Sequence, residues 1–99
     1  MAEPRATAAV RVTWKGKVQG VWFRGFVIDN ATELGLKGWV RNRPDGTVEA
    51  EIIGDGKTIN DLLRRARKGP PAARVDEAIA EPIDVPETVP NGFVQRETG

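Results

Sequence analysis

The segment between Gly16 and Arg24 has residue types that could bind an anion. It contains two glycines and ends on an arginine, and it reads Gly16, Lys17, Val18, Gln19, Gly20, Val21, Trp22, Phe23, Arg24. Glycines let a backbone curl so that successive N–H groups approach a ligand closely. A guanidinium can hold two phosphate oxygens at once. The segment therefore predicts a phosphate-binding loop, although a structural turn with a solvated Arg24 stays open as the alternative.

The residue types that are missing narrow the chemistry of such a loop. The chain has no Cys and no His, and it contains no Asp-x-Asp pair. These absences argue against a thiolate nucleophile, a phosphohistidine and a carboxylate pair holding Mg²⁺. Water could still attack a well-held phosphoryl group if the leaving group needs no general acid. Carboxylates leave in this way because their parent acids have pKa values of about 4 to 5, which favours acyl phosphates over phosphate monoesters.

Composition indicates an ordinary globular chain. It has 99 residues and a formal net charge of +1, which suits one domain and gives no overall attraction to nucleic acid or to anionic membranes. No apolar run approaches the ~18 residues of a membrane span. The segment of the first six residues is short and polar, and it has no apolar core of the kind found in signal peptides. We expect a cytoplasmic protein with a flexible tail over residues 1–6 and a single domain over residues 7–99.

Periodicity predicts the elements that must position the loop. Residues 7–14 alternate between apolar and polar, which is typical of a half-buried strand. From Phe23 the apolar residues follow helical spacing up to Gly35, a natural helix stop. Residues 37–43 and 47–53 predict two strands around the turn Arg43-Pro44-Asp45-Gly46. A second helix follows, with Thr58 as its expected N-cap and Gly69-Pro70-Pro71 after its end. Residues 75–80 and 93–96 predict the last strands.

This order, βαββαβ with a small extra strand, predicts an α+β fold. The expected architecture is the ferredoxin-like split βαβ sandwich, one antiparallel-mixed sheet with two helices on one face. A helix after the first strand implies a crossover. We therefore expect the first and third strands to be parallel neighbours.

Two stretches together resemble the acylphosphatase family. They are VQGVWFR and, further on, LGLKGWVRNRPDGTVEAEIIG with a later GPPAARVD, so the likeness extends over almost the whole chain. The resemblance implies a small hydrolase of the carboxyl-phosphate bond that needs no metal or cofactor. It implies that Arg24 is the catalytic arginine, that residues 16–22 bind the phosphate, and that Asn42 orients the attacking water. We expect a monomer, with inorganic phosphate or sulfate as competitive ligands.

Two other readings remain open. The same topology serves RNA recognition, for which aromatic side chains on the exposed sheet would be expected; such a non-catalytic binding module is our alternative. The third predicted strand instead carries Glu49 and Glu51. An acylphosphatase-like unit within a larger carbamoyl-transferring protein is the other reading.

Two single residues have structural interpretations of their own. Without the resemblance, Asn42 before a hairpin would be interpreted as a turn residue. Trp39 is expected in the core or in a wall of the site.

Overall fold

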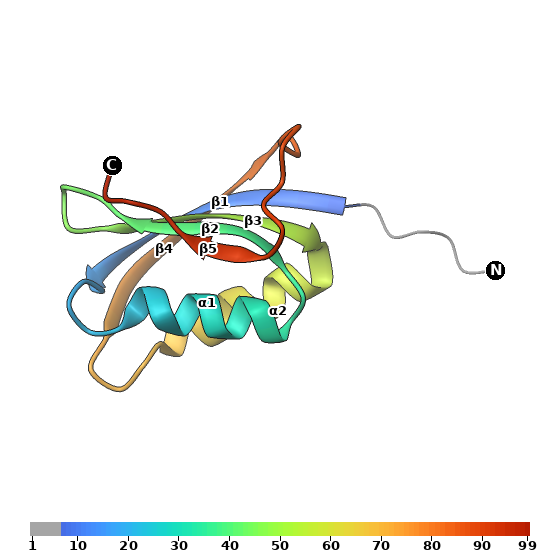
Figure 1. Cartoon of the computed structure of the whole chain (residues 1–99). Coiled ribbons are helices and arrows are strands. Elements are labelled where there is room, and N and C mark those ends of the chain that lie inside the picture. Colours follow the sequence, from blue (N-terminus) through green and yellow to red (C-terminus); the bar gives the residue numbers. More distant parts are fainter. Residues whose placement is uncertain (1–6) are drawn as a thin grey trace.

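A computed structural model describes residues 7–99, and the tail expected over residues 1–6 lies outside the described residues. One mixed sheet carries both helices on the same face (Figure 1), with the strand order β4-β1-β3-β2-β5. The elements are β1 (Thr7–Lys17), α1 (Phe23–Glu33), β2 (Lys37–Asn42), β3 (Val48–Asp55), α2 (Gly56–Lys68), β4 (Arg74–Ile83) and β5 (Phe93–Gln95). The ferredoxin-like α+β fold that the sequence predicts is confirmed.

The expected direction of the third strand is wrong. β1 and β3 are neighbours, but they pair antiparallel, with Thr7 opposite Asp55 and Trp14 opposite Val48. β3 is also antiparallel to β2, so β1 and β2 run in the same direction on either side of it. The crossover through α1 leaves room for one strand, and the tight β2–β3 hairpin returns β3 into that space. Within the described sheet, the parallel neighbours are β2 and β5.

β1 and β4 extend further than their apolar patterns predict. β1 continues past residue 14 to Lys17, because Gly16 and Lys17 pair with Val75 and Arg74 of β4 after a register shift. β4 runs to Ile83 and includes Pro82, which an edge strand tolerates because its missing N–H can face solvent. Cross-strand pairing, rather than periodicity, sets both ends.

The two helices end and begin through different devices. α1 stops as predicted at Gly35, which has φ 73° and donates to the Thr32 carbonyl, while the Leu36 N–H reaches the Ala31 carbonyl. These two bonds are a Schellman motif. α2 begins earlier than predicted, since its N-cap is Asp55 and not Thr58. The Asp55 carboxylate accepts a hydrogen bond from the Thr58 amide at 3.4 Å.

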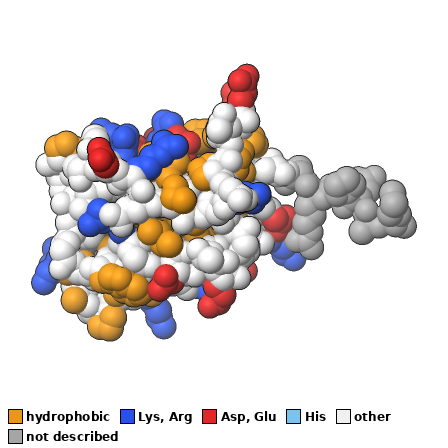
Figure 2. All heavy atoms as spheres, in the orientation of Figure 1, with side chains coloured by type: hydrophobic (Ala, Val, Ile, Leu, Met, Phe, Trp, Pro, Cys, Tyr) orange, Lys and Arg blue, Asp and Glu red, His pale blue; other side chains and the backbone are white. Residues whose placement is uncertain are grey.

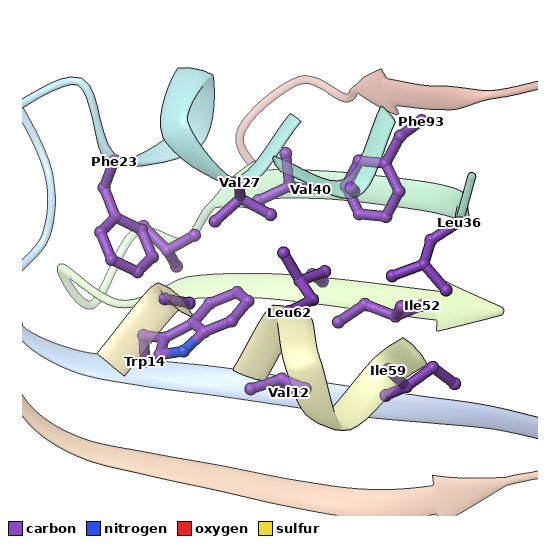
Figure 3. Packing of buried hydrophobic residues seen from close by; sticks show 14 of the residues in the cluster. Val12, Trp14, Phe23, Val27, Leu36, Val40, Ile52, Ile59, Leu62 and Phe93 are labelled. Atoms are coloured by element: carbon purple, nitrogen blue, oxygen red, sulfur yellow. The ribbon is translucent and has the colours of Figure 1, made fainter. Parts of the chain in front are cut away.

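The core lies between the sheet and the helices (Figure 3). Its largest fully buried side chains include Trp14, Phe23, Ile52, Ile59 and Leu62. The Trp14 and Phe23 rings meet edge to face, with centroids 5.2 Å apart. Because Phe23 is the first residue of α1, this contact fixes the start of the helix against β1. The chain that connects them, residues 18–22, is therefore held at both ends.

Candidate active site

The loop between β1 and α1 is shorter than predicted and consists of residues 18–22. Val18 is fully buried in the core, and Val21 packs against it. Gly16 and Lys17, which were expected to bind phosphate, belong to the sheet and do not line the pocket beside the loop. Their predicted contact with the ligand stays untested, and the loop itself is the part with free backbone groups.

Backbone handedness alternates within loop 18–22. Gly20 has φ 74° and Trp22 has φ 64°, with Val21 between them at negative φ. Alternation of this kind turns successive N–H groups to one side and forms an anion-binding concavity. Within the described residues 7–99, no acceptor takes a hydrogen bond from the amides of residues 19–22. The loop thus presents unpaired donors.

The N-terminus of α1 adds to this positive potential. Its N-cap, Trp22, makes no capping bond through its side chain, and no acidic residue occupies the first turn. α2 differs, because Asp55 caps it. Arg24 lies in the first turn of α1, and no carboxylate among residues 7–99 pairs with it. A helix N-terminus together with an unpaired arginine favours binding of an anion.

A small pocket joins these groups. Its volume is about 160 Å³, and its lining is Val18, Gly20, Trp22, Phe23, Arg24, Gly25 and Gln95. Four of the predicted site residues therefore meet at one pocket: Val18, Gly20, Trp22 and Arg24. Asn42 does not line it. The space beside Gly20 is open, since a Cβ built there would meet no atom within 4 Å. Because glycine has no side chain to fill this space, a ligand can approach the backbone.

Asn42 stands at the last position of β2, where the sheet meets the β2–β3 hairpin. It follows Val40, a core residue, at an interval of two, so its side chain belongs to the helix-covered face of the sheet. Its side-chain oxygen Oδ1 is buried and has no hydrogen-bond partner within residues 7–99. A buried acceptor without a partner is rare and costs free energy, so this oxygen suits a small polar ligand such as water.

The side chain of Gln19 connects the loop to the hairpin beside Asn42. Its Nε2 donates to the carbonyl oxygens of Arg43 and Thr47, both at 2.9 Å. Figure 1 shows this loop and the hairpin at the same end of the molecule. Gln19 was predicted to bind phosphate, and its amide N–H remains available for that. Its side chain has a different role, because it fixes loop 18–22 relative to the end of β2.

The hairpin has its own internal support. The predicted turn is confirmed, since Gly46 donates to the Arg43 carbonyl at 3.1 Å. The Asp45 carboxylate accepts from the Thr47 hydroxyl at 2.7 Å and from the Thr47 amide at 3.0 Å. These bonds, the hydroxyl first, hold the pKa of Asp45 below its usual range. The end of β2 is thereby held in one geometry near neutral pH.

Sequence reasoning missed three features of this site. Gln19 bonds to Arg43 and Thr47, which lie 24 and 28 positions further along the chain, and no periodic pattern reveals such a contact. Gln95 reaches the pocket only because β5 pairs with β2. Gly25 lies beneath the Trp22 indole, where a Cβ would come within 2.1 Å of the ring nitrogen. A glycine inside the first turn of a predicted helix was the one available signal.

Comparison with known proteins places the chain in a family. The sequence model of the acylphosphatase family matches residues 10–95. An acylphosphatase of Rhizorhabdus wittichii is 50% identical over 90 residues, which are 91% of this chain and 89% of that protein. An acylphosphatase structure from Coxiella burnetii has a TM-score of 0.84 at 39% identity, and the match covers 91% and 93% of the two chains.

A longer protein contains a similar unit. The crystal structure of full-length HypF in its phosphate- and nucleotide-bound form has a TM-score of 0.87 at 28% identity, over 99% of this chain but only 13% of that one.

The family match and the relative at 50% identity show that the chain belongs to the acylphosphatase family and is a hydrolase of acyl phosphates. None of the helices within residues 7–99 has the length and apolarity to cross a membrane.

Proposed function

We propose that hydrolysis proceeds by direct attack of water on a phosphoryl group held by Arg24 and the amides of loop 18–22. The water oxygen bonds to phosphorus while the bond from phosphorus to the acyl oxygen breaks, and the electron pair leaves with the carboxylate. An acyl phosphate dianion and water give a carboxylate and dihydrogen phosphate. Both hydrogens of the water stay with the phosphate, so the charges balance without a protein base.

The observation that carries this proposal is the set of unpaired donors around one small pocket. The amides of residues 19–22 lack acceptors within the described chain, α1 has no side-chain cap, and Arg24 has no carboxylate partner there. Preorganised donors of this kind stabilise charge that develops on phosphoryl oxygens. The loop and Arg24 supply that stabilisation in the proposed mechanism.

Asn42 positions the nucleophile in this mechanism. Its Oδ1 accepts a hydrogen from the attacking water, and its NH₂ can donate to a phosphoryl oxygen. Support comes from the buried and unpartnered Oδ1 and from Gln19, which ties the loop to the carbonyls on either side of the turn after Asn42. Holding a nucleophile in line contributes a large part of the rate in reactions of this kind.

The test is hydrolysis of acetyl phosphate by purified protein in excess EDTA, with inorganic phosphate as inhibitor. We expect full activity without metal, because the chain has no His or Cys and lacks an Asp-x-Asp pair. Phosphate and sulfate should inhibit competitively. Activity that EDTA abolishes and Mg²⁺ restores would contradict the metal-free mechanism. A crystal soaked in sulfate with the ion away from loop 18–22 would contradict the binding site.

The helix-free face of the sheet does not support RNA binding as a second function. Its Trp39 is only 6% exposed, because the guanidinium groups of Arg41 and Arg96 lie 5.0 and 4.7 Å from the ring centroid. Nearby acids are paired, as Arg11 with Glu51 at 2.6 Å. A covered ring, with Arg11 and Arg41 paired to Glu51 and Glu49, offers neither a stacking surface nor a strongly basic one.

We further propose that the protein is a monomer, that it acts in the cytoplasm, and that residues 7–99 form one domain. β4 is an edge strand, and its Pro82 together with Asp76, Glu77 and Glu81 discourages pairing with another sheet. On the face shown in Figure 2, basic and acidic side chains lie interspersed. Sedimentation equilibrium at micromolar concentration would test the monomer, and a dimeric mass would contradict it.

A further inference from the structure

The pocket beside Arg24 is too small to enclose an acyl phosphate with a large acyl group. Its volume is about 160 Å³, whereas pockets that enclose drug-sized molecules span roughly 300–1,000 Å³. A phosphoryl group held by loop 18–22 would occupy part of this space, and a large acyl group would extend beyond the pocket. The side chains around the mouth of the pocket therefore decide which acyl groups are recognised. Trp22 and Gln95 are the exposed candidates, because both line the pocket and they come from different elements, the loop and β5.

Trp22 stands out among the exposed residues of the described chain. It is 60% exposed, while the other large hydrophobic side chains of comparable exposure, Val85 and Val94, are smaller. Its indole therefore contributes little burial to the core. Residues 7–99 include no other non-glycine residue at positive φ, a conformation that is unfavourable for a bulky side chain.

Gly25 shows that the position of the indole is built into the fold. A Cβ at this position would lie 2.1 Å from the indole Nε1 and 2.4 Å from Cε2. The ring thus rests directly on the backbone of the first turn of α1, over a glycine that weakens a helix. The positive φ of Trp22 and the glycine at position 25 are both locally unfavourable, and together they hold one exposed ring beside the pocket. Local strain of this kind is typical of ligand-binding positions.

We propose that Trp22, together with Gln95, forms an acyl-group subsite that favours acyl phosphates with an aromatic or extended apolar acyl group. This proposal rests on the proposed function for the phosphoryl end. The indole offers a flat apolar surface for stacking, and the carboxamide of Gln95 can donate a hydrogen bond to the acyl carbonyl oxygen. Trp22 is then a specificity-determining residue whose backbone serves the phosphate and whose side chain serves the acyl group.

The experiment compares kcat/KM for benzoyl phosphate and acetyl phosphate in the parent protein, Trp22→Gly and Trp22→Asn. Gly and Asn both accept positive φ, so the loop can keep its shape without the ring. We expect the ratio of benzoyl to acetyl kcat/KM to fall about tenfold in both variants, as for loss of an aromatic contact. Gly25→Ala should lower the same ratio, because its methyl group displaces the indole. Val85→Ala, an exposed apolar change at a different surface pocket, should leave the ratio unchanged.

A second measurement does not depend on turnover. Calorimetry should show that phenylphosphonate binds the parent protein more tightly than methylphosphonate, and that Trp22→Gly removes this difference. If Trp22→Gly hydrolyses both substrates with the parent ratio, the acyl subsite is wrong and the proposed function stands. If the parent hydrolyses neither substrate and binds neither phosphonate, the proposed function fails first and the subsite with it.

Discussion

At the scale of single residues, the site combines groups that are costly to the fold. Trp22 adopts a left-handed backbone, which costs an L-residue roughly 1–2 kcal/mol. The Oδ1 of Asn42 is buried without a partner, and Arg24 lacks a carboxylate partner within residues 7–99. None of these choices stabilises the protein. In the proposed mechanism, the free donors bind the phosphoryl group and the Asn42 oxygen accepts a hydrogen bond from the attacking water.

Arg24→Lys should fail although it keeps the positive charge. Lysine is a point donor and cannot hold two phosphoryl oxygens in one plane. We expect a higher inhibition constant for inorganic phosphate and a fall in kcat of at least about 10². The measurement is steady-state hydrolysis of acetyl phosphate with phosphate inhibition. Kinetics close to those of the parent would show that Arg24 is only a surface residue.

Asn42→Ala should separate chemistry from binding. Loss of the group that positions the water should lower kcat by a factor on the order of 10² or more, while the inhibition constant of phosphate changes little. The thermal midpoint should hold or rise, because the change removes a buried acceptor that has no hydrogen-bond partner among the described residues 7–99. Asn42→Asp should also be slow, since a carboxylate repels the phosphoryl group and donates no hydrogen bond. An active Asn42→Ala variant would assign the water to another residue.

At the scale of elements, the site depends on how loop 18–22 and the β2–β3 hairpin are joined. The loop is anchored by Val18 in the core and by Phe23 against Trp14. The hairpin is anchored by Asp45 and Thr47. The side chain of Gln19 joins these two pieces by two hydrogen bonds, and through them it helps to position Arg24 relative to Asn42.

Gln19→Ala should therefore lower both stability and turnover. Two hydrogen bonds disappear, worth about 1 kcal/mol each, and a domain of this size loses roughly 4–8 °C in Tm per kcal/mol. We expect kcat to fall more than phosphate affinity, because Asn42 moves relative to a loop that still binds. Differential scanning calorimetry and steady-state kinetics measure the two effects. Gln19→Glu keeps the length but cannot donate, so it should be no better than Gln19→Ala. A fully active Gln19→Glu variant would contradict the positioning role.

At the scale of the whole molecule, ligand binding should appear as stability. An anion that binds only the folded chain stabilises it by RT ln(1 + [L]/Kd), about 2.7 kcal/mol at 100 times Kd. We expect phosphate to raise Tm of the parent and of Asn42→Ala, and to raise it much less in Arg24→Lys. Chloride at equal ionic strength is the control. An equal rise in all three proteins would place phosphate away from Arg24.

The sequence by itself determined the order of the elements, the fold class and the family. Alternation in β1, helical spacing after Phe23, the Gly35 stop and the turn at Asp45-Gly46 are local signals, and each is confirmed. Adjacent residues also sufficed to predict an anion-binding loop before Arg24, because a glycine loop that enters a helix is a local feature. The residues that resemble the family supplied the prediction for Asn42.

Only the tertiary structure decided how these pieces meet. Periodicity does not specify strand direction, so β3 was correctly expected beside β1, but its antiparallel direction was missed. The end of β1 depends on pairing with β4, which shortened the predicted loop to residues 18–22. The contact of Gln19 with the hairpin, the arrival of Gln95 at the pocket and the seat of Trp22 on Gly25 are contacts across space. Long-range packing creates such contacts, and spacing along a single sequence carries no record of them.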